Sequence, residues 1–183
     1  MHLEKEVTVL EIDKKEIEER LKLIGATKVG DFHQKRFTYD FIPFQKDKWI
    51  RLRSNGKVTT LTIKEIIDRD KIDGTKELEI EVSDFEKTNE LLENLGYYHR
   101  NYQENLRTMY LLDNTEISID TWPLIPTYME IEGKNNEDVI AVIKKLELDK
   151  YEITSWDVTS IYEEKYGIDI LNIKELKLEA ERD

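Results

Sequence analysis

The segment from residue 76 to residue 82 constrains the fold more than any other stretch of the chain. It reads Lys-Glu-Leu-Glu-Ile-Glu-Val, so acidic and apolar residues alternate without a break. Successive side chains of a β-strand point to opposite faces, which places Glu77, Glu79 and Glu81 on one face and the apolar residues on the other. Three carboxylates on one strand face repel one another. The segment is therefore predicted to be a strand whose polar face meets water, cations or basic partners.

The same alternation recurs along the chain, with acids in some segments and bases in others. Segment 49–53 places Arg51 and Arg53 on one face, and segment 128–132 does the same for Glu130 and Glu132. A single strand of this kind fits an antiparallel sheet with one solvated face. Its recurrence favours strands whose charged faces converge. These faces carry Glu4, Glu6, Arg51, Arg53, Lys64, Glu77, Glu79, Glu81, Arg107, Asp120, Glu130 and Glu132.

Helical patterns separate the predicted strands. Asp13 with Glu16 three residues later forms a capping-box pattern before a helix over residues 14–24, and Gly25 follows at the usual end position. Similar caps predict helices over about residues 85–95 and 137–146, and a further helix over residues 161–162. Because these helices need an apolar sheet face to cover, the charged faces are expected to look inward. Enough such strands can close into a barrel with a polar lumen.

The composition excludes several classes of function. A formal net charge of -12 makes the chain a poor general binder of nucleic acid or of anionic membranes. The chain has no cysteine, which excludes thiolate chemistry. No apolar run approaches the roughly 20 residues of a membrane helix. We expect a cytoplasmic protein with one domain over residues 1–170 and a charged tail over residues 171–183.

Both signs of charge are expected in one lumen, and this combination suits an anionic ligand together with a divalent cation. Clustered carboxylates offer the hard oxygen ligands that Mg²⁺ and Mn²⁺ prefer. The forked guanidinium of arginine suits phosphate oxygens. The sequence therefore predicts a phosphate–metal site, although it contains no glycine-rich phosphate loop.

The order of these motifs resembles the CYTH-domain family of triphosphate tunnel metalloenzymes, which includes class IV adenylate cyclases, thiamine triphosphatases and inorganic triphosphatases. Glu4 and Glu6 match the acids of the ExExK signature, while Thr8 stands in place of its lysine. Leu106 takes one place of a usually basic pair before Arg107. The resemblance spans roughly residues 3–167, and its other matches are the segment 39–43, Arg51, Arg53, Lys64, Glu79, Glu81, Asp120, Glu130 and Glu132.

The resemblance implies an α+β fold, in which a closed eight-stranded antiparallel β-barrel forms a tunnel with helices packed on its outside. It implies a set of phosphate-binding residues, namely Arg36, Arg51, Arg53, Lys64 and Arg107. It implies Mg²⁺ or Mn²⁺ ligands, namely Glu4, Glu6, Asp120, Glu130 and Glu132. The implied catalytic residues are Lys64, Glu79 and Glu81, the two acids acting through a second metal or an oriented water.

The function expected from this resemblance is divalent-metal-dependent hydrolysis of a triphosphate, whether inorganic triphosphate, thiamine triphosphate or a nucleoside triphosphate. One alternative is a class IV-type adenylate cyclase, for which the sequence identifies neither a ribose base nor an adenine pocket. Another is a noncatalytic module that binds polyphosphate or an organic phosphate, which the loss of basic residues at Thr8 and Leu106 keeps open. The expected partner is a small-molecule triphosphate, with no nucleic acid or membrane, and the chain is expected to be a monomer or a homodimer.

Overall fold

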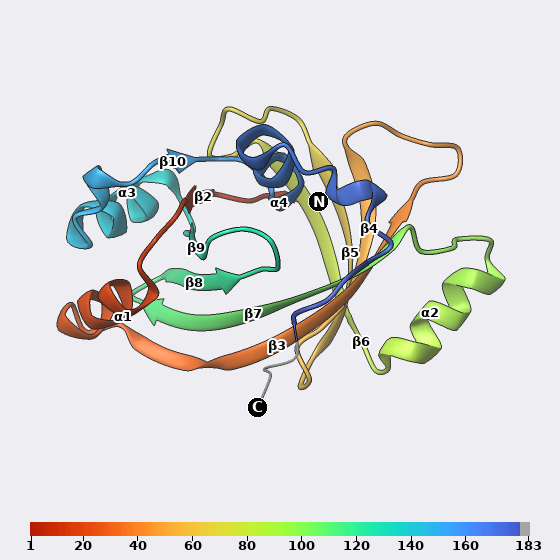
Figure 1. The fold of residues 1–183 in the computed structure, drawn as a ribbon, viewed down its shortest axis with the longest axis horizontal. Helices are drawn as coiled ribbons and strands as arrows, with labels where there is room; N and C mark the ends of the chain where they lie inside the picture. Colours follow the sequence, from red (N-terminus) through yellow and green to blue (C-terminus); the bar gives the residue numbers. More distant parts are fainter. Residues whose placement is uncertain (180–183) are drawn as a thin grey trace.

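The computed structural model describes residues 1–179 and builds them around one strongly curled β-sheet (Figure 1). The strands follow one another in the order β1-β6-β5-β4-β3-β7-β8-β9-β2-β10, and β11 pairs in parallel with β7 outside this path. All pairs along the path are antiparallel. The strands are β1 His2–Leu3, β2 Glu6–Val9, β3 Thr27–Asp40, β4 Lys48–Ser54, β5 Thr59–Ile66, β6 Thr75–Val82, β7 Asn101–Leu112, β8 Thr115–Thr121, β9 Tyr128–Glu132, β10 Ile153–Thr154 and β11 Glu175–Leu176.

The N-terminal segment bridges two distant parts of the sheet. β1 pairs with β6, whereas β2, which follows it directly in the chain, pairs with β9. Between them the amides of Glu4 and Glu6 donate to the carbonyls of Thr75 and Ile72 at 3.0 and 3.1 Å. The N-terminal residues therefore form two short strands that pair with different parts of the sheet.

The predicted α+β class and the antiparallel pairing are confirmed. The closed eight-stranded barrel is not, because within residues 1–179 the architecture is a curled sheet with ten strands along its path.

Helices lie where the capping patterns predict them. The main helices are α1 Lys14–Leu23, α2 Phe85–Asn94 and α3 Asn136–Lys145. Asp13, Asp84 and Asn135 cap them, each side chain accepting from a backbone N–H three residues later. The helix expected near residue 161 is a short α4, Val158–Ser160, continued by a π turn, Ile161–Lys165. Two 3₁₀ turns complete the described part, Leu148–Lys150 and Ile170–Asn172.

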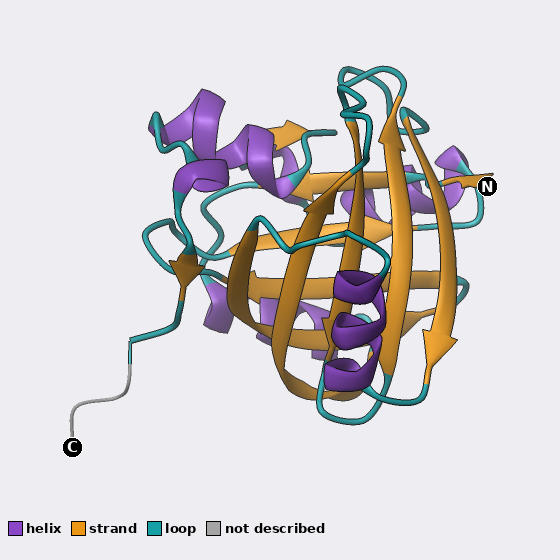
Figure 2. Ribbon diagram, turned by 90° about the vertical axis from the view of Figure 1, so that its right-hand side faces the viewer, coloured by secondary structure: helices purple, strands orange, loops and turns teal. Residues whose placement is uncertain are grey.

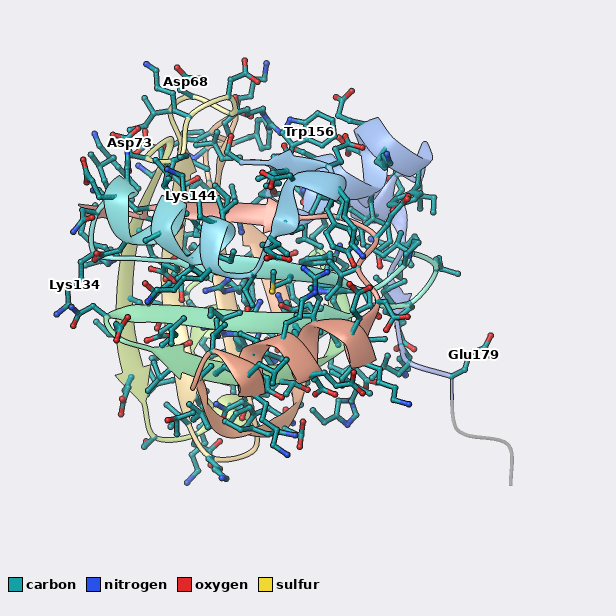
Figure 3. The ribbon with its side chains drawn as sticks, turned by 90° about the vertical axis from the view of Figure 1, so that its left-hand side faces the viewer. Asp68, Asp73, Lys134, Lys144, Trp156 and Glu179 are labelled. Atoms are coloured by element: carbon teal, nitrogen blue, oxygen red, sulfur yellow. The ribbon has the colours of Figure 1, made fainter. Side chains whose placement is uncertain are left out.

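Two of these helices cover the outer, apolar face of β2, β8 and β9. Ile17 of α1 and Val139 of α3 are fully buried in one cluster with Ile119 and Ile131 of the strands. Figure 3 shows α1 and α3 lying across the same side of the sheet, with Lys144 of α3 pointing away from it. Burial of this face fixes the register, because a shift by one residue would turn the apolar side chains into the lumen.

The other outer faces are covered by α2 and by the C-terminal segment. Phe85 and Leu92 of α2 pack on Leu52 of β4 and Tyr39 of β3, and Figure 2 shows α2 lying along the outside of the strands. A third cluster joins the C-terminal segment to β2, β9 and the loop between β8 and β9. Its buried members are Leu10, Trp122, Ile125, Tyr128, Ile161, Tyr162, Ile170 and Leu176.

The predicted charged tail begins inside this C-terminal segment. Leu176 is 4 % exposed, and its strand β11 lies beside β7. Residues 180–183 of the predicted tail lie outside the described residues, and the domain division at residue 170 stays a prediction. No helix in residues 1–179 is both long and apolar enough to cross a membrane.

Candidate functional site

The inner face of the curled sheet surrounds a cavity of about 860 Å³. One end is lined by the β3–β4 loop, the β5–β6 loop and residues 157–159, and the other by Asn55, Val58, Glu81 and Glu116. Charged side chains of the strands form much of the wall between the two ends. The sequence prediction that the charged strand faces converge on one interior is confirmed.

Arg69 joins the loops at one end of this cavity. Its Nη2 lies 2.6 Å from Asp47 Oδ1 of the β3–β4 loop, and its Nη1 lies 3.6 Å from Asp157 Oδ1. The same guanidinium donates to Ser160 Oγ, and Ser155 Oγ donates to the Arg69 carbonyl at 2.7 Å. The β5–β6 loop is thereby fixed to the segment that follows β10.

The bases of β4 are already paired with the acids of β6. Arg51 Nη2 lies 3.4 Å from Glu79 Oε2 and 3.6 Å from Glu77 Oε1, and Arg53 Nη2 lies 3.5 Å from Glu79 Oε2. Thr62 Oγ1 donates to Glu79 Oε2 at 2.7 Å. Burial, together with the charges of Arg51 and Arg107, lowers the pKa of Arg53 to about 10. A phosphate entering here would exchange partners with Glu79, so each contact is weaker than with an unpaired arginine.

Lys64 lies between two buried carboxylates. Its Nζ is 3.0 Å from Glu4 Oε1 and 2.8 Å from Glu77 Oε2. Burial raises the pKa of Glu4 to about 8, against the charge of Lys64. Burial would also raise the pKa of Glu77, but its hydrogen bond with Glu4 and the charges of Lys64 and Arg51 hold it below the usual value. Glu4 is therefore the more readily protonated of the two acids beside Lys64.

Arg107 lies between Asp120 and Glu130. Its Nε donates to Asp120 Oδ1 at 2.8 Å, and its Nη2 to Glu130 Oε2 at 2.5 Å. Burial opposes the charge of Arg107, yet the two carboxylates raise its pKa well above the usual value. Asp120 is 0 % exposed and does not line the cavity; its oxygens also accept from Asn105 and Ser118. This geometry makes Asp120 a support for Arg107, and its predicted role as a metal ligand stays a prediction.

Arg36 differs from the other bases of the cavity. It is 4 % exposed, and its Nη2 donates to two amide oxygens, those of Gln34 at 2.9 Å and of Asn105. No carboxylate of residues 1–179 forms an ion pair with it, and its Nε is buried without a hydrogen-bond partner among those residues. Burial lowers the pKa of Arg36 well below its usual value, and the charges of Arg51 and Arg53 lower it further. A buried cation that forms no ion pair is costly, which favours an anionic ligand at this position.

Carboxylates form a row across β2, β9 and β8. Glu6 lies opposite Glu132, and Glu132 lies opposite Glu116. With Glu130, these acids line a niche of about 30 Å³. Burial raises the pKa of Glu6 well above its usual value and the charge of Glu130 adds to the rise, while burial also raises the pKa of Glu132.

This row provides the test of fit for a divalent metal. A cation would relieve the repulsion between its hard oxygen donors, so the residues fit Mg²⁺ or Mn²⁺ by chemistry. Within residues 1–179, however, no three acids or histidines are already close enough together to hold an ion. Glu4 is bound to Lys64 and Glu130 to Arg107, so binding would require these two side chains to exchange partners.

The remaining predicted positions are placed as follows. Glu81 is exposed at one end of the cavity, opposite Thr60. Thr8 pairs with Glu130 across β2 and β9, but it is 1 % exposed and its hydroxyl donates to the Trp156 carbonyl at 3.3 Å. Leu106 is 45 % exposed, outside the cavity wall that Arg107 lines.

Sequence reasoning assigned no role to several residues of the wall. Glu77 was placed on the charged face but given no role, and Glu116 was not included, although it alternates with Asp120 along β8 in the same way. Trp122 and Gln34 gave no such signal, because the first lies outside the regular strand and the second is an uncharged residue within one.

Comparison with known proteins agrees with this geometry. A family model described as the CYTH domain matches residues 3–159, and the chain belongs to this family. A search of curated proteins found no match.

Solved structures of similar fold come from archaea, bacteria and a plant. PH1012 protein from Pyrococcus horikoshii OT3 is 25% identical with a TM-score of 0.70, over 82% of this chain and 94% of that one. A candidate adenylate cyclase from Vibrio parahaemolyticus is 15% identical with a TM-score of 0.70, over 82% and 93%. A candidate adenylyl cyclase from Hippeastrum, HpAC1, described as having a dominant triphosphatase activity, is 12% identical with a TM-score of 0.61, over 94% and 100%.

Proposed function

We propose that this protein binds a small-molecule triphosphate in the cavity and hydrolyses it with Mg²⁺ or Mn²⁺. The observation that carries the proposal is the set of bases on one cavity wall, in which Arg36 forms no ion pair with a carboxylate of residues 1–179 and keeps a buried Nε without a hydrogen-bond partner. A linear polyanion is complementary to such a wall. The triphosphatase activity described for the Hippeastrum protein, which shares the fold, supports the choice of reaction.

Phosphate binding would proceed by exchange of ion-pair partners. Arg51 and Arg53 would turn from Glu79 toward phosphate oxygens, and Lys64 would leave Glu4 for the same purpose. Arg36 would need no exchange. Forked charge-assisted contacts contribute about 1.5–3 kcal/mol each, less the cost of breaking the resident pair.

Hydrolysis requires a water placed in line with the terminal phosphorus; the new P–O bond forms as the bond to the departing diphosphate breaks. Glu79, which accepts a hydrogen bond from Thr62, would orient this water, with Glu81 lining the cavity end. Arg53 and Lys64 would neutralise the charge that develops on the phosphoryl oxygens.

The residues that would hold the metal are Glu6, Glu130 and Glu132, with Glu4 after it leaves Lys64. A bound Mg²⁺ or Mn²⁺ supplies Lewis-acid stabilisation of phosphoryl charge. Glu116 completes the same acidic row, and Asp120 is better placed to hold Arg107 than to meet the ion.

A panel assay tests the proposal. Purified protein is incubated with inorganic triphosphate, ATP or thiamine triphosphate, each with Mg²⁺, Mn²⁺ or EDTA. Metal-dependent release of phosphate supports a triphosphatase. Cyclic AMP from ATP would favour the cyclase alternative, which rests only on the fold shared with the candidate cyclases. Tight triphosphate binding without either product would favour the noncatalytic module. The ion pairs of Glu4 with Lys64 and of Glu130 with Arg107 are compatible with that alternative.

We also propose where this protein acts and as which oligomer. The net charge of -12 argues against binding of nucleic acid or anionic membranes, and a cytoplasmic location is proposed with the activity. Residues 1–170 are proposed to act as one domain, as a monomer or a homodimer.

A further inference from the structure

The Arg36 guanidinium lies over an aromatic ring. Its central carbon is 4.5 Å from the centroid of Trp122, which is 3 % exposed, and both residues line the cavity. A guanidinium over an indole face gains a cation–π attraction that strengthens as water is excluded. Gln34 and Asn105 bind one edge of the guanidinium, so Trp122 fixes the plane that the amides leave free.

Tyr162 in turn packs against Trp122. The two rings meet edge to face, with centroids 6.2 Å apart and planes at 74°. Tyr162 is 0 % exposed, and its hydroxyl donates to the Pro123 carbonyl at 2.5 Å. Since Pro123 follows Trp122 directly, Tyr162 contacts both the indole and the backbone that carries it. These contacts restrain the loop between β8 and β9 where Trp122 meets Arg36.

Both stacked groups keep a buried donor without a partner among residues 1–179, Arg36 Nε and Trp122 Nε1. A buried donor without a partner loses its hydrogen bond to water and gains none in the fold. Unsatisfied buried groups in a native fold call for an explanation, and a functional site is one of the recognised explanations. The arrangement is therefore costly to the fold and is not explained by packing alone.

We propose that Trp122 and Tyr162 are positioning residues, which hold the Arg36 guanidinium in the orientation that binds a phosphoryl group of the substrate. The proposal rests on the triphosphate function proposed above. It assigns the site a component from outside the matched family domain, because Tyr162 lies beyond residue 159, where the CYTH match ends. The C-terminal segment thus contributes to phosphate binding without touching the substrate.

A first experiment needs no substrate and so separates this proposal from the proposed function. The Arg36 Nε–H resonance is assigned by ¹⁵N NMR in the ligand-free protein with the help of Arg36→Lys. We expect a slowly exchanging signal whose chemical shift is displaced by the indole ring current. The displacement should disappear in Trp122→Leu, and the signal should broaden in Tyr162→Ala. A signal that is unchanged in Trp122→Leu overturns the proposal, whatever the protein binds.

A second experiment measures inorganic triphosphate binding by calorimetry, well below the melting temperature of every variant. Trp122→Leu should weaken binding about 3- to 30-fold, the range of a desolvated cation–π contact, and Trp122→Phe should restore much of the loss. In an Arg36→Ala background the Trp122→Leu change should have little further effect, since Trp122 acts through Arg36. Full additivity of the two losses overturns the proposal.

Leu146→Ala is the matched control for destabilisation. Leu146 is 1 % exposed in the separate cluster under α3, so its truncation loosens the fold without touching the stack. We expect it to lower the melting temperature and leave triphosphate affinity unchanged. If Leu146→Ala weakens binding as much as Trp122→Leu does, the effect of Trp122 is general destabilisation and the positioning role is wrong.

Discussion

The guanidinium of Arg107 and the carboxylate of Asp120 meet through two contacts of 2.8 Å, Nε to Oδ1 and Nη2 to Oδ2. Asp120 is 0 % exposed, whereas Arg107 lines the cavity. The pair therefore joins the buried structure to the proposed phosphate site, and its removal should affect both stability and binding.

Asp120→Ala should lower the free energy of unfolding by about 3–5 kcal/mol, because it leaves a buried guanidinium without its main partner. Urea denaturation followed by circular dichroism measures the loss. Ser118→Ala, which removes only a hydroxyl near the same carboxylate, should cost about 1 kcal/mol. Similar losses in the two variants would show that the ion pair does not support the fold.

Arg36→Ala should weaken binding of inorganic triphosphate more than Arg53→Ala does. Arg36 has no carboxylate partner to give up, whereas Arg53 must leave Glu79. We expect losses of about 10- to 100-fold for Arg36 and about 3- to 10-fold for Arg53 by calorimetry. The reverse order would mean that the resident ion pairs do not reduce phosphate affinity.

Stability should fall as the pH rises through the neutral range. The pKa of Glu4 is raised from 4.5 to about 8, so the folded protein holds a proton that the unfolded chain has lost. Its contribution is complete below pH 4.5 and is lost as the pH passes about 8. Glu6 and Glu132, whose pKa values are also raised, act in the same direction.

Urea denaturation in EDTA between pH 5.5 and 8.5 checks this dependence. We expect Glu4→Gln to remove about 1–3 kcal/mol of the decline. Glu81→Gln changes an exposed acid and should leave the decline as it is in the unmodified protein. A decline of equal size in the Glu4 variant would show that Glu4 does not hold the proton.

Metal affinity should depend on the acidic row. Glu6→Gln and Glu132→Gln should each weaken Mn²⁺ binding about tenfold or more by calorimetry, because each removes a charged oxygen donor. Glu90→Gln, on the exposed side of α2, is the control and should bind as before. Unchanged affinity in both row variants would end the metal assignment.

Strand alternation was enough to predict most of the sheet and much of the cavity wall. Glu130 and Glu132, or Arg51 and Arg53, lie on one face simply because they are two residues apart, and the cavity confirms that face as inward. The caps Asp13, Asp84 and Asn135 were predictable because their contacts are local.

The remaining features depend on contacts between distant segments. The break between β1 and β2 arises because one segment pairs with both β6 and β9. The burial of Thr8 under Trp156, and of Asp120 behind Arg107, depends on how closely segments far apart in sequence pack. The stack of Arg36, Trp122 and Tyr162 joins three such segments, which no periodicity reveals.

The central claim is tested most directly by phosphate release from inorganic triphosphate, measured with Mn²⁺ for the unmodified protein, Arg36→Ala and Glu130→Gln. The account predicts metal-dependent turnover by the unmodified protein, severe loss in Glu130→Gln, and in Arg36→Ala a loss that higher substrate concentration partly recovers. The account is contradicted if the unmodified protein shows neither turnover nor calorimetric binding of triphosphate, with or without Mn²⁺.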